Sequence, residues 1–175
     1  YSLLEKKSYE KQKKLLKDVL EKGNNKFTLD SLSIEELSID APIKISYRFT
    51  IPDYAVQNAG HTMINLNFHK GFFDALNFSK RKYGVDFSYS STHKLSVSLL
   101  LDPQQKIDFL PEKVEASSNQ ISFSSSYNSS STQIQFNNEI ELATPAIIAA
   151  DFDACDKVVN RYKKNKSQLV SISPK

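Results

Sequence analysis

The stretch from Ile121 to Phe136, ISFSSSYNSSSTQIQF, decides how this chain is organised. Seven of its sixteen residues are serine, a composition typical of a flexible linker. A linker would imply two separate modules, whereas a folded pair of strands would imply one. The position of the apolar residues within the stretch distinguishes these two interpretations.

The alternation of side chains favours the folded pair. Ile121, Phe123 and Tyr127 share one parity, and the apolar residues that follow take the other: Ile134, Phe136, Ile140 and Leu142. The parity switches across residues 128–132, NSSST, where a hairpin would turn. An isolated hairpin does not offset the entropy lost on ordering it, so its apolar face must lie on a second layer. The serines are therefore predicted to form the solvent face of a sheet within one domain.

Other segments repeat the strand alternation. Residues 43–51, IKISYRFTI, alternate apolar and polar side chains between two prolines, and residues 62–69 and 94–101 do so again. Weaker strands are predicted at residues 34–39, 106–110 and 168–172. Because no strand–helix repeat appears, the sequence predicts a mainly β fold, an antiparallel β-sandwich or open barrel.

Helical spacing is confined to the two ends. Residues 1–24 are rich in Lys and Glu and predict a helix that docks through Leu15 to Leu20. Near the C-terminus, a second helix is predicted to pack one face on the sheet: Phe152, Cys155, Val158 or Val159, and Tyr162. The expected organisation is an N-terminal helix and linker over 1–24, continuous with a single sandwich domain over 25–175 that ends in a helix and a last strand.

Composition excludes several functional classes. The net charge of +3 is spread along 175 residues, whereas a nucleic-acid groove needs a concentrated basic stripe. No apolar run approaches the roughly 18 residues that cross a bilayer. We therefore expect neither nucleic-acid binding nor membrane insertion by this segment. Because the chain begins with Tyr1, we expect a processed product or a fragment of a longer protein.

Cys155 is the single cysteine and the first candidate nucleophile. The three histidines all precede it: His61, His69 and His93. In papain-like enzymes and transglutaminases the cysteine comes before its histidine, so the order here is reversed. Cys155 also falls on the apolar face of the predicted helix, which indicates a structural thiol. The sequence thus predicts no catalytic residue.

Metal binding is not expected either. His61 and His69 fall near opposite ends of one predicted strand, without a compact group of ligands. The acids Asp151, Asp153 and Asp156 are spaced vaguely like a calcium loop, but Asp156 stands where that loop needs glycine. They are predicted to be helix N-terminal acids, and the sequence predicts no metal ion and no cofactor.

Three stretches, 78–103, 107–127 and 149–172, carry a family resemblance. Residues of the first match an Arg-x-x-Pro-Val-Asp-Phe motif: Arg81, Val85, Asp86 and Phe87. Leu110 and Pro111 match a Leu-Pro step before a sheet strand, and Phe152 opens the packed face of a closing helix. From about Ser31 to Ile172 the chain resembles the C-terminal β-sandwich domain of unknown function that follows a transglutaminase-like core in large bacterial cell-envelope proteins.

The chain departs from this pattern at two points. Gly84 stands where proline is usual, and the turn Asp102-Pro103-Gln104 lacks the expected glycine. No catalytic residue is carried over, because the family's thiol, imidazole and carboxylate belong to the core that precedes this domain.

The resemblance implies a non-enzymatic accessory module of an exported bacterial protein, located in the periplasm or at the cell surface. Its expected partner is the upstream transglutaminase-like domain of the same polypeptide, with protein or glycan at the cell surface as a further partner. One alternative is a carbohydrate- or protein-binding module that stacks sugars on exposed aromatics such as Tyr47, Tyr54, Tyr89 or Tyr127. Another is an independent hydrolase, which needs two acids or a triad in a cleft.

Overall fold

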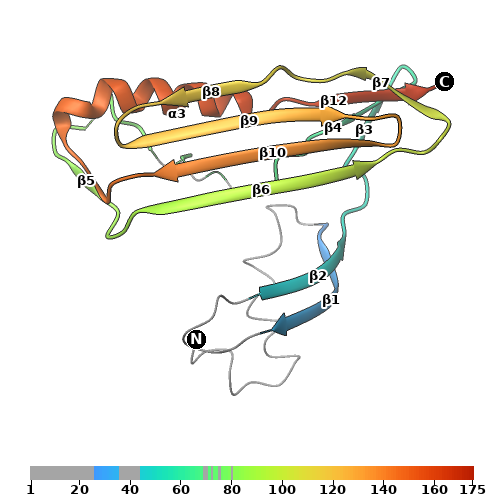
Figure 1. The fold of residues 1–175 in the computed structure, drawn as a ribbon, viewed down its shortest axis with the longest axis horizontal. Helices are drawn as coiled ribbons and strands as arrows, with labels where there is room; N and C mark the ends of the chain where they lie inside the picture. Colours follow the sequence, from blue (N-terminus) through green and yellow to red (C-terminus); the bar gives the residue numbers. More distant parts are fainter. Residues whose placement is uncertain (1–25, 36–43, 69–70, 72, 75, 80) are drawn as a thin grey trace. The chain divides into compact units, whose positions relative to one another are not determined.

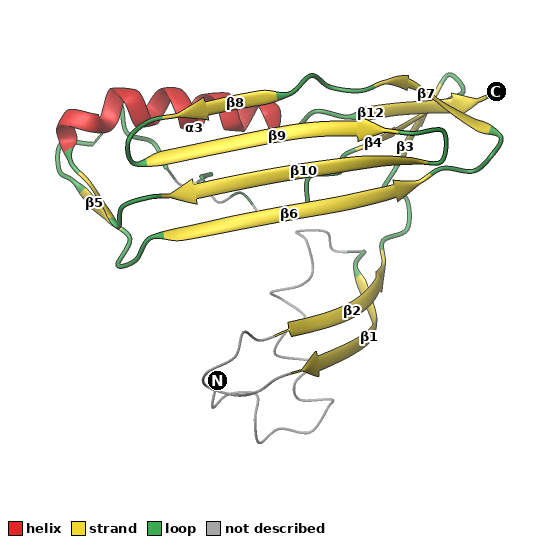
Figure 2. Cartoon of the chain, in the orientation of Figure 1, coloured by secondary structure: helices red, strands yellow, loops and turns green. Residues whose placement is uncertain are grey.

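The computed structural model describes residues 26–35, 44–68, 71, 73–74, 76–79 and 81–175. The chain divides into two compact units, Tyr1–Tyr54 and Ala55–Lys175, and each is described here by itself. The helix predicted over 1–24 lies outside the described residues. The single domain predicted over 25–175 stays a prediction. Within the described residues, the chain is mainly antiparallel β-structure with one helix near the C-terminus (Figures 1 and 2).

The first unit contains one antiparallel strand pair. β1 (Thr28–Glu35) pairs with β2 (Lys44–Thr50), which confirms the strand predicted at 43–51. The register shifts at Asp30, and this bulge lets Leu29 and Leu32 face the same side although they are three residues apart. Together with Phe27, these two leucines form a small buried cluster of the first unit.

The larger sheet of the second unit contains the serine-rich stretch. Its strands lie in the order β6 (Ser91–Leu100), β10 (Gln133–Leu142), β9 (Ile121–Ser129) and β8 (Val114–Ser117). The predicted hairpin is confirmed: β9 and β10 pair along their length, and a turn at 130–132 joins them. The alternating apolar residues of β9 and β10 face inward and are buried, apart from the half-buried Tyr127.

A second four-stranded sheet has the order β3 (Val56–Asn58), β4 (His61–Ile64), β12 (Val170–Pro174) and β7 (Gln105–Phe109). Its inward side chains share one apolar cluster with the larger sheet: Leu66, Ile134, Phe136, Val170 and Ile172. A two-residue turn with positive φ at Ala59 and Gly60 joins β3 to β4. The described strands form open sheets and no closed barrel.

The strand predicted at 62–69 ends earlier than expected, at Ile64. The side chain of Asn65 explains the difference. Its Oδ1 accepts a hydrogen bond from the backbone N–H of Asn67 at 2.8 Å, and its Nδ2 donates to the carbonyl of Lys166 at 3.0 Å. These two bonds turn the chain out of the sheet and towards the C-terminal helix.

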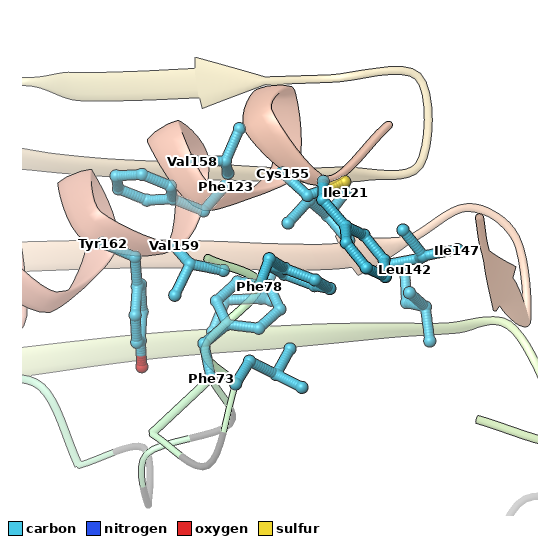
Figure 3. Close-up of a cluster of buried hydrophobic side chains, with 13 residues drawn as sticks. Phe73, Phe78, Ile121, Phe123, Leu142, Ile147, Cys155, Val158, Val159 and Tyr162 are labelled. Atoms are coloured by element: carbon cyan, nitrogen blue, oxygen red, sulfur yellow. The ribbon is translucent and has the colours of Figure 1, made fainter. Parts of the chain in front are cut away.

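The C-terminal helix α3 (Phe152–Asn165) follows the short 3₁₀ helix η1 (Ala149–Asp151) and packs on β8 and β9. The residues predicted for its packed face are all buried: Phe152, Cys155, Val158, Val159 and Tyr162. Tyr162 meets Phe73 and Phe123 edge to face, with ring centroids 5.3 and 5.6 Å apart (Figure 3). A minor ribbon of β5 (Val85–Asp86) and β11 (Ala146–Ile147) completes the second unit.

The inward face of the hairpin is divided by a polar pair. Ser125 and Asn138 lie opposite each other, and both are at most 2% exposed. On one side of this pair, the hairpin contributes Ile121, Phe123, Ile140 and Leu142 to a cluster that includes the buried face of α3, called here the cluster under α3. On the other side, it contributes Ile134 and Phe136 to the cluster shared with the second sheet. Asn138 Nδ2 donates to the carbonyl of Ser124 at 3.1 Å, so the buried amide is held in place.

Candidate functional site

The outward side of the larger sheet is a polar surface. Strand alternation sends the apolar residues inward and the serine, asparagine and glutamine residues outward. We call this surface the serine face, and define it by the outward residues of β6, β10, β9 and β8. Two of its rows across the strands read Lys94, Glu139, Ser124, Glu115 and Ser96, Asn137, Ser126.

A ladder of side-chain hydrogen bonds orders the seam between β6 and β10. The hydroxyl of Ser98 donates to Gln135 Oε1, and Gln135 Nε2 donates to Ser96 Oγ at 2.7 Å. The hydroxyl of Ser96 in turn donates to Asn137 Oδ1 at 2.9 Å. Each hydroxyl and carbonyl oxygen in the ladder has more than one lone pair, so these groups can still accept bonds from a partner. The seam is therefore an ordered, polar contact surface.

Charged side chains on and beside the serine face form two ion pairs. Lys94 Nζ lies 3.1 Å from Glu139 Oε1, and Lys113 Nζ lies 2.6 Å from Glu115 Oε1. These pairs are exposed and contribute little to stability. The outward charged residues of the four strands are Lys94, Glu115, Glu139 and Glu141, so the serine face itself is acidic on balance.

Two open depressions, of about 320 and 280 Å³, lie on the serine face and share Ser124 and Glu139. The larger one also contains Glu115, so it holds two carboxylates. A glycosidase acid must stay protonated in a protected environment. Glu115 and Glu139 are 60% and 45% exposed and each pairs with a lysine, so neither lies in such a protected environment.

Cys155 lies one turn into α3 and is fully buried. Its Sγ lies 3.6 Å from Ser118 Oγ and donates to Gln120 Oε1 at 3.8 Å. Burial raises the pKa of the thiol; the hydrogen bond from Ser118 lowers it, and the charge of Asp151 raises it further. A thiol with these neighbours is held as the protonated form. The side chain lies on the packed face of the helix, as the sequence predicts.

A cluster that the sequence did not predict joins β4, β7 and β12. His61 Nδ1 lies 2.9 Å from Asp108 Oδ2, and Ser173 Oγ donates to Asp108 Oδ1 at 2.9 Å. The hydrogen bond from Ser173 is the largest cause that lowers the pKa of Asp108; desolvation opposes it, and His61 and Lys106 lower the pKa further. In a serine protease triad the imidazole stands between the serine and the acid. Here the carboxylate stands in the middle, so the order of groups in a catalytic triad is not reproduced.

The remaining candidate residues are dispersed. His93 is exposed on β6, opposite Ile140, and His69 lies outside the described residues. Asp151 accepts a hydrogen bond from Gln120 Nε2 at 2.7 Å, and Asp156 accepts one from Asn160 at 2.8 Å. Within the described part of the chain, no group of three or more His, Cys, Asp or Glu side chains could hold a metal ion.

The tyrosines proposed for sugar stacking do not lie on the serine face. Tyr127 faces the core against Phe136, with ring centroids 4.8 Å apart, and burial raises its pKa to about 12. Tyr47 belongs to the cluster of the first unit, and Tyr54 is half-buried, which raises its pKa. Tyr89 is 70% exposed but follows the ribbon strand β5. The outward residues of β6, β8, β9 and β10 include no aromatic side chain.

Comparison with known proteins places this fold in a family. Residues 60–172 match the family described as "Domain of Unknown Function with solved-structure structure (DUF3858)". The chain belongs to the DUF3858 family. No curated protein matches the chain. The domain of unknown function expected from the sequence resemblance is thereby confirmed at the level of the family.

One solved structure gives a wider context for the DUF3858 domain. It is a crystal structure described as a "putative protease" from Parabacteroides distasonis ATCC 8503, with a TM-score of 0.54 and 13% sequence identity. The match covers 66% of this chain and 24% of that chain. This chain therefore spans about a quarter of the longer protein, and the likeness concerns the fold alone.

The residues that carried the resemblance have structural roles in this DUF3858 domain. Val85 and Phe87 pack against the cluster under α3, and the N–H of Phe87 donates to the carbonyl of Pro145 at 2.7 Å. Asp86 Oδ1 accepts the N–H of Ser88 at 2.7 Å and closes the following turn. At Gly84, a Cβ would lie 3.0 Å from the carbonyl oxygen of Ile147, so glycine permits the close approach of β11.

Among the described helices, none is long and apolar enough to cross a bilayer.

Proposed function

We propose that this chain is a non-catalytic sandwich module of a larger exported bacterial protein, and that it holds a transglutaminase-like core in place through its serine face. The module acts in the periplasm or at the cell surface. Its contribution is to bind and orient a neighbour, either the core of the same polypeptide or another protein at the surface.

The observation that carries this proposal is the state of the single thiol. Cys155 lies on the buried face of α3, beside the hydroxyl of Ser118 and the amide of Gln120, and burial raises its pKa. A nucleophilic cysteine needs access and a neighbouring base that generates the thiolate. The chemistry of a transglutaminase-like protein would therefore come from the part of the polypeptide that this chain does not contain.

The comparison with a longer protein supports an accessory role. The match occupies 24% of a chain described as a "putative protease", so most of that protein lies outside the shared fold. A transglutaminase-like core and a protease both act on the acyl groups of peptides. The domain would then be the non-reacting part of a protein that acts on peptide substrates.

The serine face suits such a role better than it suits sugar binding. Its ladder of Ser96, Ser98 and Gln135 is already ordered, so a partner need not immobilise those side chains on binding. Sugar recognition by stacking needs an exposed aromatic platform, and Tyr127 points into the core instead.

The test begins with the open reading frame that encodes the parent protein. A Cys, a His and an Asp in that order, upstream of Tyr1, are expected. The purified 175-residue chain should show neither amine transfer nor peptidase activity, and it should bind the separately expressed upstream core in calorimetry. Activity in this chain alone, or a parent that lacks those three residues, would refute the proposal.

The role of the serine face is tested with two matched variants. Ser124→Arg adds a large charged side chain where both depressions meet, and it should weaken binding of the core about tenfold or more. Ser167→Arg makes the same change at an exposed position after α3 and should leave binding unchanged. Equal affinities for the two variants would show that the core binds another surface.

A further inference from the structure

Among the strands that the structure describes, β6 is the long edge strand of the larger sheet. It is outermost in the strand order, and it pairs with β10 over ten residues without a register shift. Figure 2 shows it as a long straight arrow at the border of the sheet. An edge strand presents a row of unpaired N–H and C=O groups that can pair with another chain.

The other edge strands of the two four-stranded sheets have features that hinder pairing with another chain, and β6 lacks these features. β8 has four residues and β3 has three, so both are short. β7 carries a register irregularity at Asp108, which interrupts regular pairing. β6 contains no proline and no bulge.

The inward side chains of β6 leave the core incompletely covered. Leu95, Val97 and Leu99 pack against the shared cluster but stay only partly buried, whereas Ile134 and Phe136 on the neighbouring β10 are at most 1% exposed. An additional strand beside β6 would cover this border, provided that it alternates apolar and polar residues in the same way.

The sequence of β6 supplies that partner strand itself. Residues 95–99 read Leu-Ser-Val-Ser-Leu, which is the same in both directions. We propose that β6 pairs antiparallel with β6 of a second copy of this chain, about a twofold axis at Val97. The contact is isologous, as in most dimers, and it joins the two larger sheets into one continuous sheet.

This register pairs like with like over residues 95–99. Val97 faces its own copy, Leu95 faces Leu99 of the second copy, and Ser96 faces Ser98 of the second copy. Lys94 faces Leu100 of the second copy, so no two lysines are opposed. The apolar pairs extend the shared cluster, and the serine pairs extend the hydrogen-bond ladder of the serine face.

The experiment uses two double variants that change the same two serines. S96K/S98K places lysine opposite lysine twice in the proposed register, whereas S96K/S98E places lysine opposite glutamate twice. Both variants lose the same hydrogen bonds to Gln135 and Asn137. Far-ultraviolet circular dichroism and thermal unfolding verify that the two variants fold equally well.

Sedimentation of the 175-residue chain from about 5 to about 500 µM gives the oligomeric state. We expect the wild-type mass to rise with concentration from one chain of 19.8 kDa to two. S96K/S98K should dissociate at least about tenfold more readily than S96K/S98E. A wild-type chain that stays monomeric throughout would overturn the proposal, as would equal dissociation of the two variants.

Disulfide trapping verifies the register independently. A mixture of the Ser96→Cys and Ser98→Cys chains should form a mixed disulfide dimer, and each variant alone should not. Native Cys155 is fully buried and does not compete. If the wild-type chain is monomeric and hydrogen exchange is slow for the β6 amides on both sides of the strand, another segment already pairs with this edge. That result would also overturn the proposal.

Discussion

The reactivity of Cys155 offers the sharpest test of the non-catalytic interpretation. We expect the thiol to resist a water-soluble aromatic disulfide reagent in the native protein and to react fully once the chain is unfolded in urea. Two features of the structure give this result: the side chain is 0% exposed, and burial raises its pKa, so both access and thiolate are reduced.

The size of the effect follows from the opening that the reagent requires. Cys155 contacts the cluster under α3, so exposing it means detaching the helix from β8 and β9. If this opening costs about 5 kcal/mol, the low end of typical domain stabilities, native labelling is slowed by roughly three to four orders of magnitude. Increasing urea should restore the rate in parallel with unfolding.

Ala154 provides the matched control for this assay. It is exposed and lies beside Cys155 in the same helical turn. In a Cys155→Ala background, Ala154→Cys should be labelled at nearly the rate of a free thiol, which shows that the reagent reaches this part of the helix. Native Cys155 that reacts as fast as this control at about pH 7 would refute the structural role.

Three further predictions concern stability. Tyr162→Ala should lower the free energy of unfolding in urea by about 3 to 5 kcal/mol, because the edge-to-face contacts with Phe73 and Phe123 are lost. Tyr162→Phe should lower this free energy clearly less, and equal losses for the two variants would contradict the packing role. Ser125→Ala should leave the free energy of unfolding unchanged or raise it by about 1 kcal/mol, because the buried Ser125 hydroxyl has no hydrogen-bond partner. A decrease of more than about 1 kcal/mol would contradict this prediction. The folded-state pKa of Asp108 lies below its usual 3.8, so the contribution of its carboxylate to stability is present at neutral pH and is lost as the pH falls below that value. The melting temperatures of wild type and Asp108→Asn should therefore converge in acid. A difference that widens in acid would contradict the assignment.

Local patterns were sufficient for the long elements. The alternation in residues 43–51 and 94–101 is recovered as β2 and β6, and the parity switch at 128–132 correctly predicts the turn between β9 and β10. The packed face of α3 is also recovered. In each case one side of the element is buried, so apolar residues recur in the sequence with the period of that element.

The differences arise where a single side chain or a distant partner decides the structure. The bulge at Asp30 breaks the alternation of β1, so the prediction at 34–39 missed the beginning of this strand at Thr28. Residues 36–39 of that prediction lie outside the described residues. Strands of two to four residues, such as β5 and β8, are too short to show a period. The contact of His61 with Asp108 depends on strand order, since β12 lies between β4 and β7, and no local pattern reveals that order.

The buried pair of Ser125 and Asn138 has a consequence for misfolding. The outward residues of β9 are nearly all serine, so they would fit β10 equally well after a slip of two residues. Such a slip keeps every apolar side chain inward, and it would set the Asn138 amide against Phe123 or Tyr127 instead of a hydroxyl. The buried Asn138 amide, which donates to the carbonyl of Ser124 in the observed register, therefore disfavours a slipped pairing of β9 and β10.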